Sequence, residues 1–179
     1  LHPVIEQILS GEVLLSLSLE ALTQSRGPSL QIARSGDNWK LNGTAPAVPL
    51  ASVSRYALLA AEAIDGMHLV LIDLQEKGIQ ITAGRSQHHQ ALADLKFDDL
   101  ALNAQRVLPL NATGWAEQHA IACLASLQLG VTDQQLKRTV EYVSERQQFG
   151  RVIGSFQLVA GQMADGYIAA EALRSSLWQ

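Results

Sequence analysis

Two side chains that could bind an anionic group, Arg146 and Gln157, lie in a short polar stretch between two apolar helical patterns. A guanidinium offers forked N–H donors that match phosphate or carboxylate oxygens, and an amide adds a neutral donor without further charge. An arginine near the end of a helix is also favoured by the helix macrodipole, so a solvated structural role is the alternative for Arg146. The choice between these roles depends on the residues around them.

The other reactive side chains form no catalytic or metal-binding pattern. Cys123 is the only cysteine, which excludes an internal disulfide and a cysteine-based zinc site. Its apolar neighbours predict a small buried residue rather than a nucleophile. His88 and His89 are adjacent, and adjacent histidines without acidic partners rarely hold one metal ion together. Glu117 and His119 are explained by an exposed helix start, so we expect no metal site and name no catalytic residue.

Composition places the chain among globular proteins. Of its 179 residues, 47% are hydrophobic and 17% are charged, which is not the composition of a disordered segment. A net charge of −4 without a basic run argues against a nucleic-acid partner, because phosphate contacts need clustered Lys and Arg. No apolar stretch reaches the roughly 18–20 residues of a membrane span. The single cysteine is compatible with a reducing cytoplasm, where we expect the protein.

The beginning of the sequence, Leu1-His2-Pro3, has neither a signal-peptide pattern nor an initiator Met. This suggests a piece of a longer protein.

The first half predicts short strands. A period of two indicates half-buried strands at 13–19, 30–32, 39–41, 78–82 and 95–97, and apolar runs indicate two more at 56–61 and 67–72. Turn residues at 35–38 and at Asn42-Gly43 predict tight connections. Pro46 and Pro49 place their stretch at an edge or in a loop. Many short strands at regular intervals predict a small antiparallel β-barrel or sandwich.

From about Gly114 the hydrophobic period becomes helical. Apolar residues three to four apart predict one long helix, with its stripe at Ile121, Leu124, Leu127, Val131, Leu136, Val140 and Val143. A break at 149–154 is followed by Ser155 as the expected N-cap and by a second long helix. The wide apolar faces predict that another chain, or more of the same protein, covers these helices.

The stretch from Tyr142 to Gln157 resembles a motif of the acyl-CoA dehydrogenases, Y-x-x-x-R-x-Q-F-G-x-x-I-x-x-F-Q. Looser landmarks occur in family order, at Gly11-Glu12 with Ala21-Leu22-Thr23, at Trp39 to Gly43, at Leu95 to Leu100, at Leu129-Gly130 and at Ala164-Asp165. They resemble, in turn, the opening of the middle domain, its L-N-G hairpin, its last strand, and two points in the helical domain. The resemblance covers almost the whole chain.

The resemblance implies an α+β fold, in which an antiparallel β-barrel or sandwich middle domain precedes the first long helices of an incomplete C-terminal helical bundle. It divides the chain into the end of an N-terminal helical region (1–10), the middle β domain (11–110) and the first helices of the C-terminal dehydrogenase domain (111–179). It also implies FAD, an acyl-CoA substrate, a homo- or hetero-tetramer and an electron-transfer acceptor. In the implied reaction a carboxylate base takes the α-proton of the thioester while the β-hydrogen passes as hydride to the flavin.

The same resemblance assigns cofactor contacts. It implies that Arg146 and Gln157 bind FAD phosphates or nearby groups across a subunit interface, and that Gln148 and Phe149 line the same segment. Thr23 and Ser29 match the Thr and Ser of the family's T-E-P-G-x-G-S-D loop near the flavin ring.

The sequence departs from the family in three places. The T-E-P-G loop reads Gln24 to Pro28 with Leu30 at the Asp position. Ala47-Val48-Pro49 replaces Trp-Ile-Thr, and Ile121 replaces an arginine. One position used for the base by some members is Ala120, and the usual base lies in a helix beyond Gln179, so no catalytic carboxylate is named.

These departures leave alternatives open. The protein is either a dehydrogenase for an unusual, bulky substrate, as in bacterial steroid side-chain degradation, or a non-catalytic subunit that contributes cofactor contacts to a partner. An unrelated third possibility is a β-domain binding module with a helical dimerisation hairpin, against which the motif at 142–157 argues.

Overall fold

The computed structural model describes residues 2–19, 22 and 30–178. It divides into two compact units, Leu1–Ala116 and Glu117–Gln179, called here the sheet unit and the helical unit. The division into segments 1–10, 11–110 and 111–179 remains a prediction.

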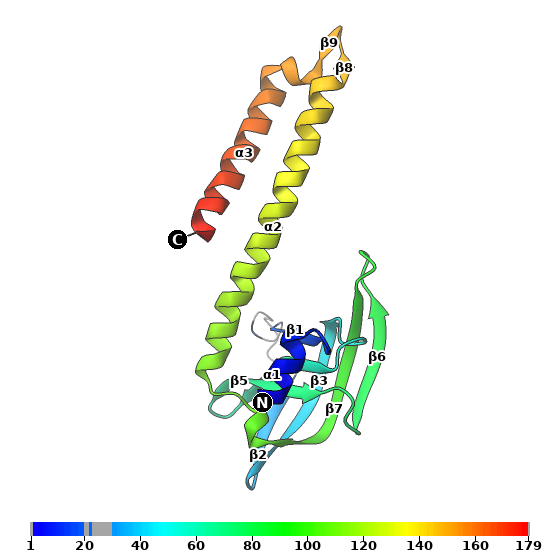
Figure 1. Ribbon diagram of the computed structural model, residues 1–179, viewed down its shortest axis with the longest axis vertical. Helices are drawn as coiled ribbons and strands as arrows, with labels where there is room; N and C mark the ends of the chain where they lie inside the picture. Colours follow the sequence, from blue (N-terminus) through cyan, green and yellow to red (C-terminus); the bar gives the residue numbers. More distant parts are fainter. Residues whose placement is uncertain (1, 20–21, 23–29, 179) are drawn as a thin grey trace. The chain divides into compact units, whose positions relative to one another are not determined.

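The sheet unit is a curled sheet preceded by a short helix, α1 (His2–Leu9) (Figure 1). Its strands are β1 (Leu15–Ser18), β2 (Leu30–Ser35), β3 (Asn38–Pro49), β4 (Tyr56–Ala63), β5 (Gly66–Asp73), β6 (Ile79–Arg85) and β7 (Ala91–Asn103). They are ordered β1-β4-β2-β3-β7-β6, and β5 pairs with β4. The α+β class and the predicted strands are confirmed. The sheet is mixed rather than wholly antiparallel, because β1 and β2 each pair with β4 in parallel.

The core follows the period-two pattern on β3 and β7. Trp39 and Leu41 of β3, and Leu95 and Phe97 of β7, are buried, whereas the residues between them on each strand are exposed. β4 and β5 are different, because their apolar runs are buried on both faces. One face joins the main core, and Ala60 and Leu69 on the other join Ala116 in a second cluster. A continuous apolar run is the pattern expected of a strand covered on both sides.

The prediction of a turn at Asn42-Gly43 is wrong. Both residues lie inside β3, at a β-bulge where the pairing with β7 shifts between Leu41 and Gly43. Gly43 has φ +115°, which a bulge position tolerates because glycine has no Cβ. The Asn42 amide donates to Asp99 Oδ1 (2.9 Å), and Asn42 Oδ1 accepts from the Asp99 N–H (2.8 Å). The polar groups that suggested a turn are therefore satisfied across the sheet.

Pro46 and Pro49 belong to β3. Among the described residues, the part of β3 beyond Gly43 is paired with β7 alone. A second register shift falls between Ala45 and Val48. A β-bulge accommodates a proline, because the ladder is already interrupted there.

The helical unit begins within the long helix α2 (Asn111–Glu145). This helix leads through a hairpin of β8 (Gln147–Gln148) and β9 (Arg151–Val152) to the 3₁₀ turn η3 (Ile153–Ser155) and the helix α3 (Gln157–Leu177). The two helices run antiparallel (Figure 1). Arg174 of α3 donates to Asp133 of α2 at 2.7 Å, and Gly154 lies against Val143. Both predicted long helices are confirmed.

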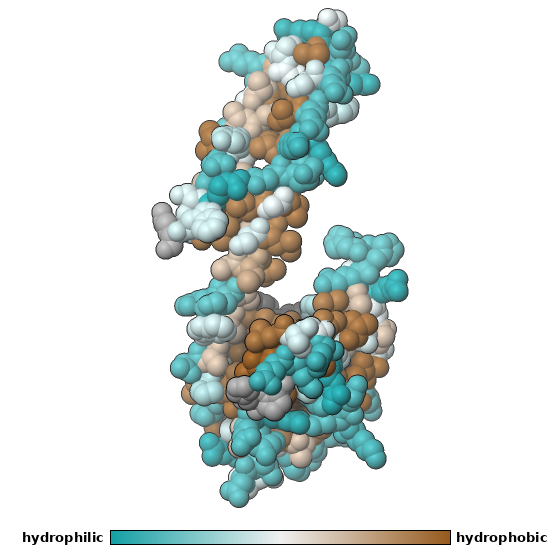
Figure 2. Space-filling model, viewed as in Figure 1, coloured by the Kyte–Doolittle hydropathy of each residue, from teal (hydrophilic) through white to brown (hydrophobic). Residues whose placement is uncertain are grey.

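The predicted apolar stripe of α2 is only partly buried. Val143 is buried, whereas Ile121, Leu124, Leu127 and Val131 are each more than half exposed. Figure 2 shows the apolar surface that these helices leave open. Within this chain the helical hairpin covers only part of its own apolar surface, as the sequence predicted.

Two local predictions in the helical unit are wrong. Ser155 is not the N-cap of α3, because Phe156 holds that position without a side-chain cap and Ser155 Oγ donates to the Val152 carbonyl at 2.7 Å. Cys123 is exposed rather than buried, as are its neighbours Ile121 and Leu124, so the described residues leave this part of α2 uncovered.

Candidate functional site

The structure gathers four of the six predicted cofactor residues at the turn between α2 and α3. Gln148 lies in β8, Phe149 in the tight turn, and Gln157 is the first residue of α3. Arg146 connects α2 to β8. All four side chains are exposed. Thr23 and Ser29 lie outside the described residues, so their role remains a prediction.

The backbone of Arg146 closes the base of the hairpin. Its N–H donates to the Tyr142 carbonyl at 2.9 Å, which completes the last turn of α2. Its carbonyl accepts from the Ile153 N–H at 2.8 Å, which continues the ladder of β8 and β9. Backbone bonds on both sides fix the Cα of Arg146, while its side chain stays exposed. A fixed base with a solvent-facing guanidinium suits the binding of an anion.

The turn of this hairpin is strained at one residue. Phe149 and Gly150 both have positive φ, +55° and +79°, as a two-residue hairpin turn of type I′ requires. Gly150 adopts this conformation readily, but a bulky residue at positive φ is uncommon and costs about 1–3 kcal/mol. Phe149 is also 92% exposed. An aromatic ring held at a strained turn and left in solvent is a candidate binding residue.

Two aromatic rings and an arginine form a cluster at this turn. The rings of Phe149 and Phe156 meet edge to face, with centroids 6.3 Å apart. The Arg151 guanidinium lies 4.0 Å from the centroid of the Phe156 ring. Arg151 was not among the predicted site residues, although its place directly after Phe149-Gly150 could have suggested it. The cluster holds two aromatic rings and the second arginine of the hairpin.

The N-terminus of α3 adds backbone donors to this region. The first N–H groups of a helix have no partner inside it and carry partial positive charge. Phe156 at the N-cap position supplies no side-chain oxygen to them. Residues 146–157 contain two arginines and no Asp or Glu. The hairpin therefore offers several N–H donors and positive charge, which is the chemistry of a phosphate site.

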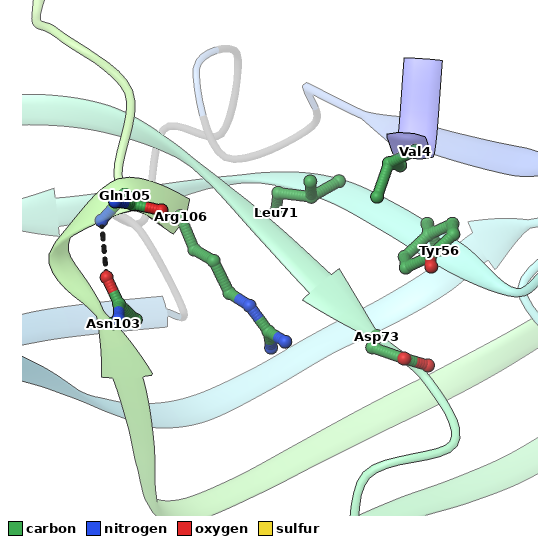
Figure 3. A pocket seen from close by; sticks show the side chains of 7 residues that line it. All are labelled: Val4, Tyr56, Leu71, Asp73, Asn103, Gln105 and Arg106. Atoms are coloured by element: carbon green, nitrogen blue, oxygen red, sulfur yellow. Dashed lines mark hydrogen bonds between the residues drawn. The ribbon is translucent and has the colours of Figure 1, made fainter. Parts of the chain in front are cut away.

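The sheet unit has a separate pocket of about 300 Å³ (Figure 3). It is lined by Val4, Tyr56, Leu71, Asp73, Asn103, Gln105 and Arg106. Figure 3 shows Arg106 extending into it from the 3₁₀ turn η2 (Ala104–Arg106). Its charges are compensated, since Arg106 pairs with Glu76 and Asp73 pairs with Arg55. None of the predicted site residues lines it. Because its charges are paired with one another, they attract a charged ligand only weakly.

The ion pair beside this pocket predicts a measurable pH dependence. Arg55 donates to both Asp73 oxygens at 2.8 Å, and this bonding holds the pKa of Asp73 below its ordinary value. Stability from a lowered carboxyl pKa is present above the unfolded pKa, about 3.9, and is lost as the pH falls through the folded one. We expect Asp73→Asn to lower the free energy of unfolding at neutral pH and to flatten its decline below about pH 4.

Chemical denaturation at a series of pH values measures this effect. Asp37→Asn is the matched control, because Asp37 is an exposed carboxylate at the β2–β3 turn that forms no ion pair with any described residue. If the free energy of unfolding of the two variants declined equally below about pH 4, the prediction would be contradicted.

The positions where the sequence departs from the family pattern have structural roles of their own. Val48 is fully buried in the sheet core, and the Ala47 N–H donates to Asp94 Oδ1 at 2.7 Å. Ile121 is 60% exposed on α2. His88 and His89 lie at the turn between β6 and β7. In the described part of the chain, no three His, Cys, Asp or Glu side chains gather as metal ligands, and no helix is long and apolar enough to cross a membrane.

A family model and several known proteins match the chain. Residues 110–179 match the family model described as "Acyl-CoA dehydrogenase, C-terminal domain". The chain is 31% identical over 172 residues to acyl-CoA dehydrogenase FadE27 of Mycobacterium tuberculosis, a match that covers 96% of this chain and 46% of that protein.

Solved structures agree. A variant of the Tcur3481-Tcur3483 steroid ACAD matches with a TM-score of 0.88 and 31% identity, over 99% of this chain and 49% of that one. The ChsE4-ChsE5 complex from Mycobacterium tuberculosis matches with a TM-score of 0.85 and 29% identity, over 96% and 47%. The chain spans about half the length of these relatives. With its sheet, its helical hairpin and its motif at 142–157 in family order, the chain is similar over almost its whole length to proteins of the acyl-CoA dehydrogenase family.

Proposed function

We propose that the chain is part of an FAD-dependent enzyme that dehydrogenates an acyl-CoA thioester between its α and β carbons. The α2–α3 hairpin carries this proposal, because the exposed Arg146 and the strained Phe149 lie in the stretch that resembles the family's cofactor segment. The flavin, when bound, accepts the hydride from the β carbon. The described residues contribute binding and orientation, and no catalytic base is assigned to them.

The residues present fit the cofactor. Arg146 would hold phosphate oxygens through its forked donors, and Gln157 would add a neutral donor at the start of α3. Gln148 and Phe149 would line the same segment, with the exposed Phe149 ring offering a flat apolar surface. A hairpin with two arginines and no carboxylate favours a pyrophosphate over a neutral group. Thr23 and Ser29 remain the other two proposed cofactor-binding residues.

A second candidate function is that of a non-catalytic subunit, which supplies the hairpin to FAD held mainly by a different chain. Two observations favour it. The positions of Trp-Ile-Thr and of the helical arginine carry Ala47-Val48-Pro49 and Ile121, which lack those side-chain contacts. The relative ChsE4-ChsE5 is a complex of two components. In this arrangement the enzyme would be a hetero-tetramer rather than a homo-tetramer.

The relatives also support a substrate class. One of them is a steroid ACAD, and we propose an acyl-CoA whose acyl group is the side chain of a steroid, ahead of a simple fatty acyl group. The electrons would pass from the flavin to an electron-transfer acceptor, and the reaction would take place in the cytoplasm.

Flavin absorbance of the natural-length protein tests both candidates. The protein is purified alone and after co-expression with a neighbouring dehydrogenase-like chain. Stoichiometric FAD in the protein alone, bleached by an acyl-CoA, is the result expected of a self-sufficient dehydrogenase. Flavin that appears only on co-expression, at about half occupancy per chain, supports the non-catalytic subunit. Absence of flavin under both conditions would overturn the cofactor assignment.

A further inference from the structure

Strand β5 holds the segment that leads from the sheet into α2. Four consecutive residues of β5 take part. The Met67 carbonyl accepts from Thr113 Oγ1 at 2.9 Å, the Leu69 carbonyl accepts from the Leu108 N–H at 2.8 Å, and Val70 forms a bridge with Val107. The fourth, His68, contacts this segment, 107–113, through its side chain. We call 107–113 the connecting segment.

His68 is buried, and both of its ring nitrogens face oxygen atoms. Nδ1 lies 2.9 Å from the Leu108 carbonyl oxygen, and Nε2 lies 3.1 Å from Asp65 Oδ1. The ring is 6% exposed and packs against Trp39, with ring centroids 5.7 Å apart. A carbonyl and an ionised carboxylate can only accept hydrogen bonds. Both contacts are therefore hydrogen bonds only when both ring nitrogens carry a proton.

Of the charged groups among the described residues, Asp65 bonds to this ring and Arg34 lies over the neighbouring Trp39 ring. Asp65 belongs to the β4–β5 turn, and bonding to His68 is the main cause that lowers the pKa of its carboxyl. The guanidinium carbon of Arg34, in β2, lies 4.9 Å from the centroid of the Trp39 ring. The positive charge of Arg34 also lowers the pKa of Asp65. A carboxylate that stays ionised keeps the acceptor that Nε2–H requires.

The two partners of His68 differ in their freedom to leave. The Asp65 side chain is about half exposed and can turn towards water. The Leu108 carbonyl is held more firmly, because the Leu108 N–H is bonded to Leu69 and the following Pro109 restricts the backbone of Leu108. A neutral imidazole has one N–H, and the ring nitrogen that keeps it is set by the more firmly held acceptor.

We propose that His68 is a proton-dependent clamp between the β4–β5 turn and the connecting segment. Doubly protonated, it binds Asp65 and Leu108 together. When it loses one proton, it keeps Nδ1–H on the Leu108 carbonyl and releases Asp65, so that the β4–β5 turn becomes free while the connecting segment stays on β5. This clamp is independent of the proposed enzymatic function.

Nitrogen-15 NMR of the histidine ring in the full chain tests the clamp directly. Spectra are recorded at a series of pH values from about pH 5 to about pH 9. We expect both ring nitrogens of His68 to be protonated at the acid end and only Nδ1 at the alkaline end. A singly protonated ring at the acid end, an Nε2–H tautomer at the alkaline end, or a doubly protonated ring throughout would each overturn the proposal.

Two variants separate the two contacts. His68→Asn places an amide donor near the position of Nδ1, and His68→Gln places one near Nε2. Hydrogen exchange of the Leu108 amide reports on the connecting segment. We expect exchange to be faster in His68→Gln than in His68→Asn by about 2- to 10-fold, the equivalent of one hydrogen bond. Equal exchange would count against the clamp, and the ring spectra decide the case if either variant fails to fold.

Discussion

Replacing Arg146 with alanine is expected to weaken FAD binding by about 10- to 100-fold in the natural-length protein, together with any partner chain that it needs. A hydrogen bond to a charged group contributes about 1.5–3 kcal/mol, and 1.4 kcal/mol corresponds to a factor of ten. The backbone bonds of Arg146 to Tyr142 and Ile153 do not involve its side chain, so the hairpin should remain folded. Titration with FAD, followed by quenching of flavin fluorescence, measures the change.

Arg138→Ala is the matched control for this experiment. Arg138 is an exposed arginine of the same helix and forms no ion pair with any described residue. It should bind FAD as the unmodified protein does. Arg146→Lys should lie between the two, because an ammonium keeps the charge but loses the forked donors. If Arg146→Ala and Arg138→Ala bind FAD equally well, Arg146 is only a solvated helix-end cation.

Replacing Gly154 with alanine is expected to destabilise the helical unit by about 1–3 kcal/mol, the usual cost of overpacking. A Cβ at this position would lie 2.9 Å from the Val143 carbonyl oxygen and 3.3 Å from its Cγ2. The close atom belongs to the backbone of α2 and cannot turn aside as a side chain could. Thermal unfolding followed by circular dichroism measures the loss.

Gly161→Ala provides the opposite case on α3. A Cβ there meets no atom within 4 Å, and alanine favours a helix over glycine by about 1 kcal/mol. We expect Gly161→Ala to be neutral or stabilising in the same assay. A Gly154 variant as stable as the Gly161 variant would show that α2 and α3 can separate without cost.

Periodicity predicted the strands and helices well, because each depends on residues close in sequence. The alternating residues of β3 and β7 and the continuous runs of β4 and β5 are local signals, and the structure has a strand at each. The parallel pairing of β1 with β4 is not local. No short turn connects these strands, so nothing in either sequence sets their relative direction. Asn42-Gly43 misled for the same reason, since the partner of Asn42 is Asp99, far along the chain.

The candidate site could be located from sequence, but its strain could not. The motif at 142–157 pointed to Arg146, Gln148, Phe149 and Gln157, which the structure places at one hairpin. Phenylalanine is a poor residue for positive φ, so its conformation in the turn had no signal in residue type. Ser155 has the side chain of an N-cap, yet the 3₁₀ turn uses its hydroxyl elsewhere and moves the start of α3 past Phe156.

The contact of Gly154 with Val143 lies at the end of α2 from which α3 turns back. With 21 residues and a rise of 1.5 Å per residue, α3 is about 30 Å long. A tilt of about 10° at Gly154 would therefore displace the far end of α3 by about 5 Å. Such a sideways displacement would separate Arg174 from Asp133, which are hydrogen-bonded at 2.7 Å. The close approach of Gly154 to Val143 therefore affects a contact at the opposite end of α3.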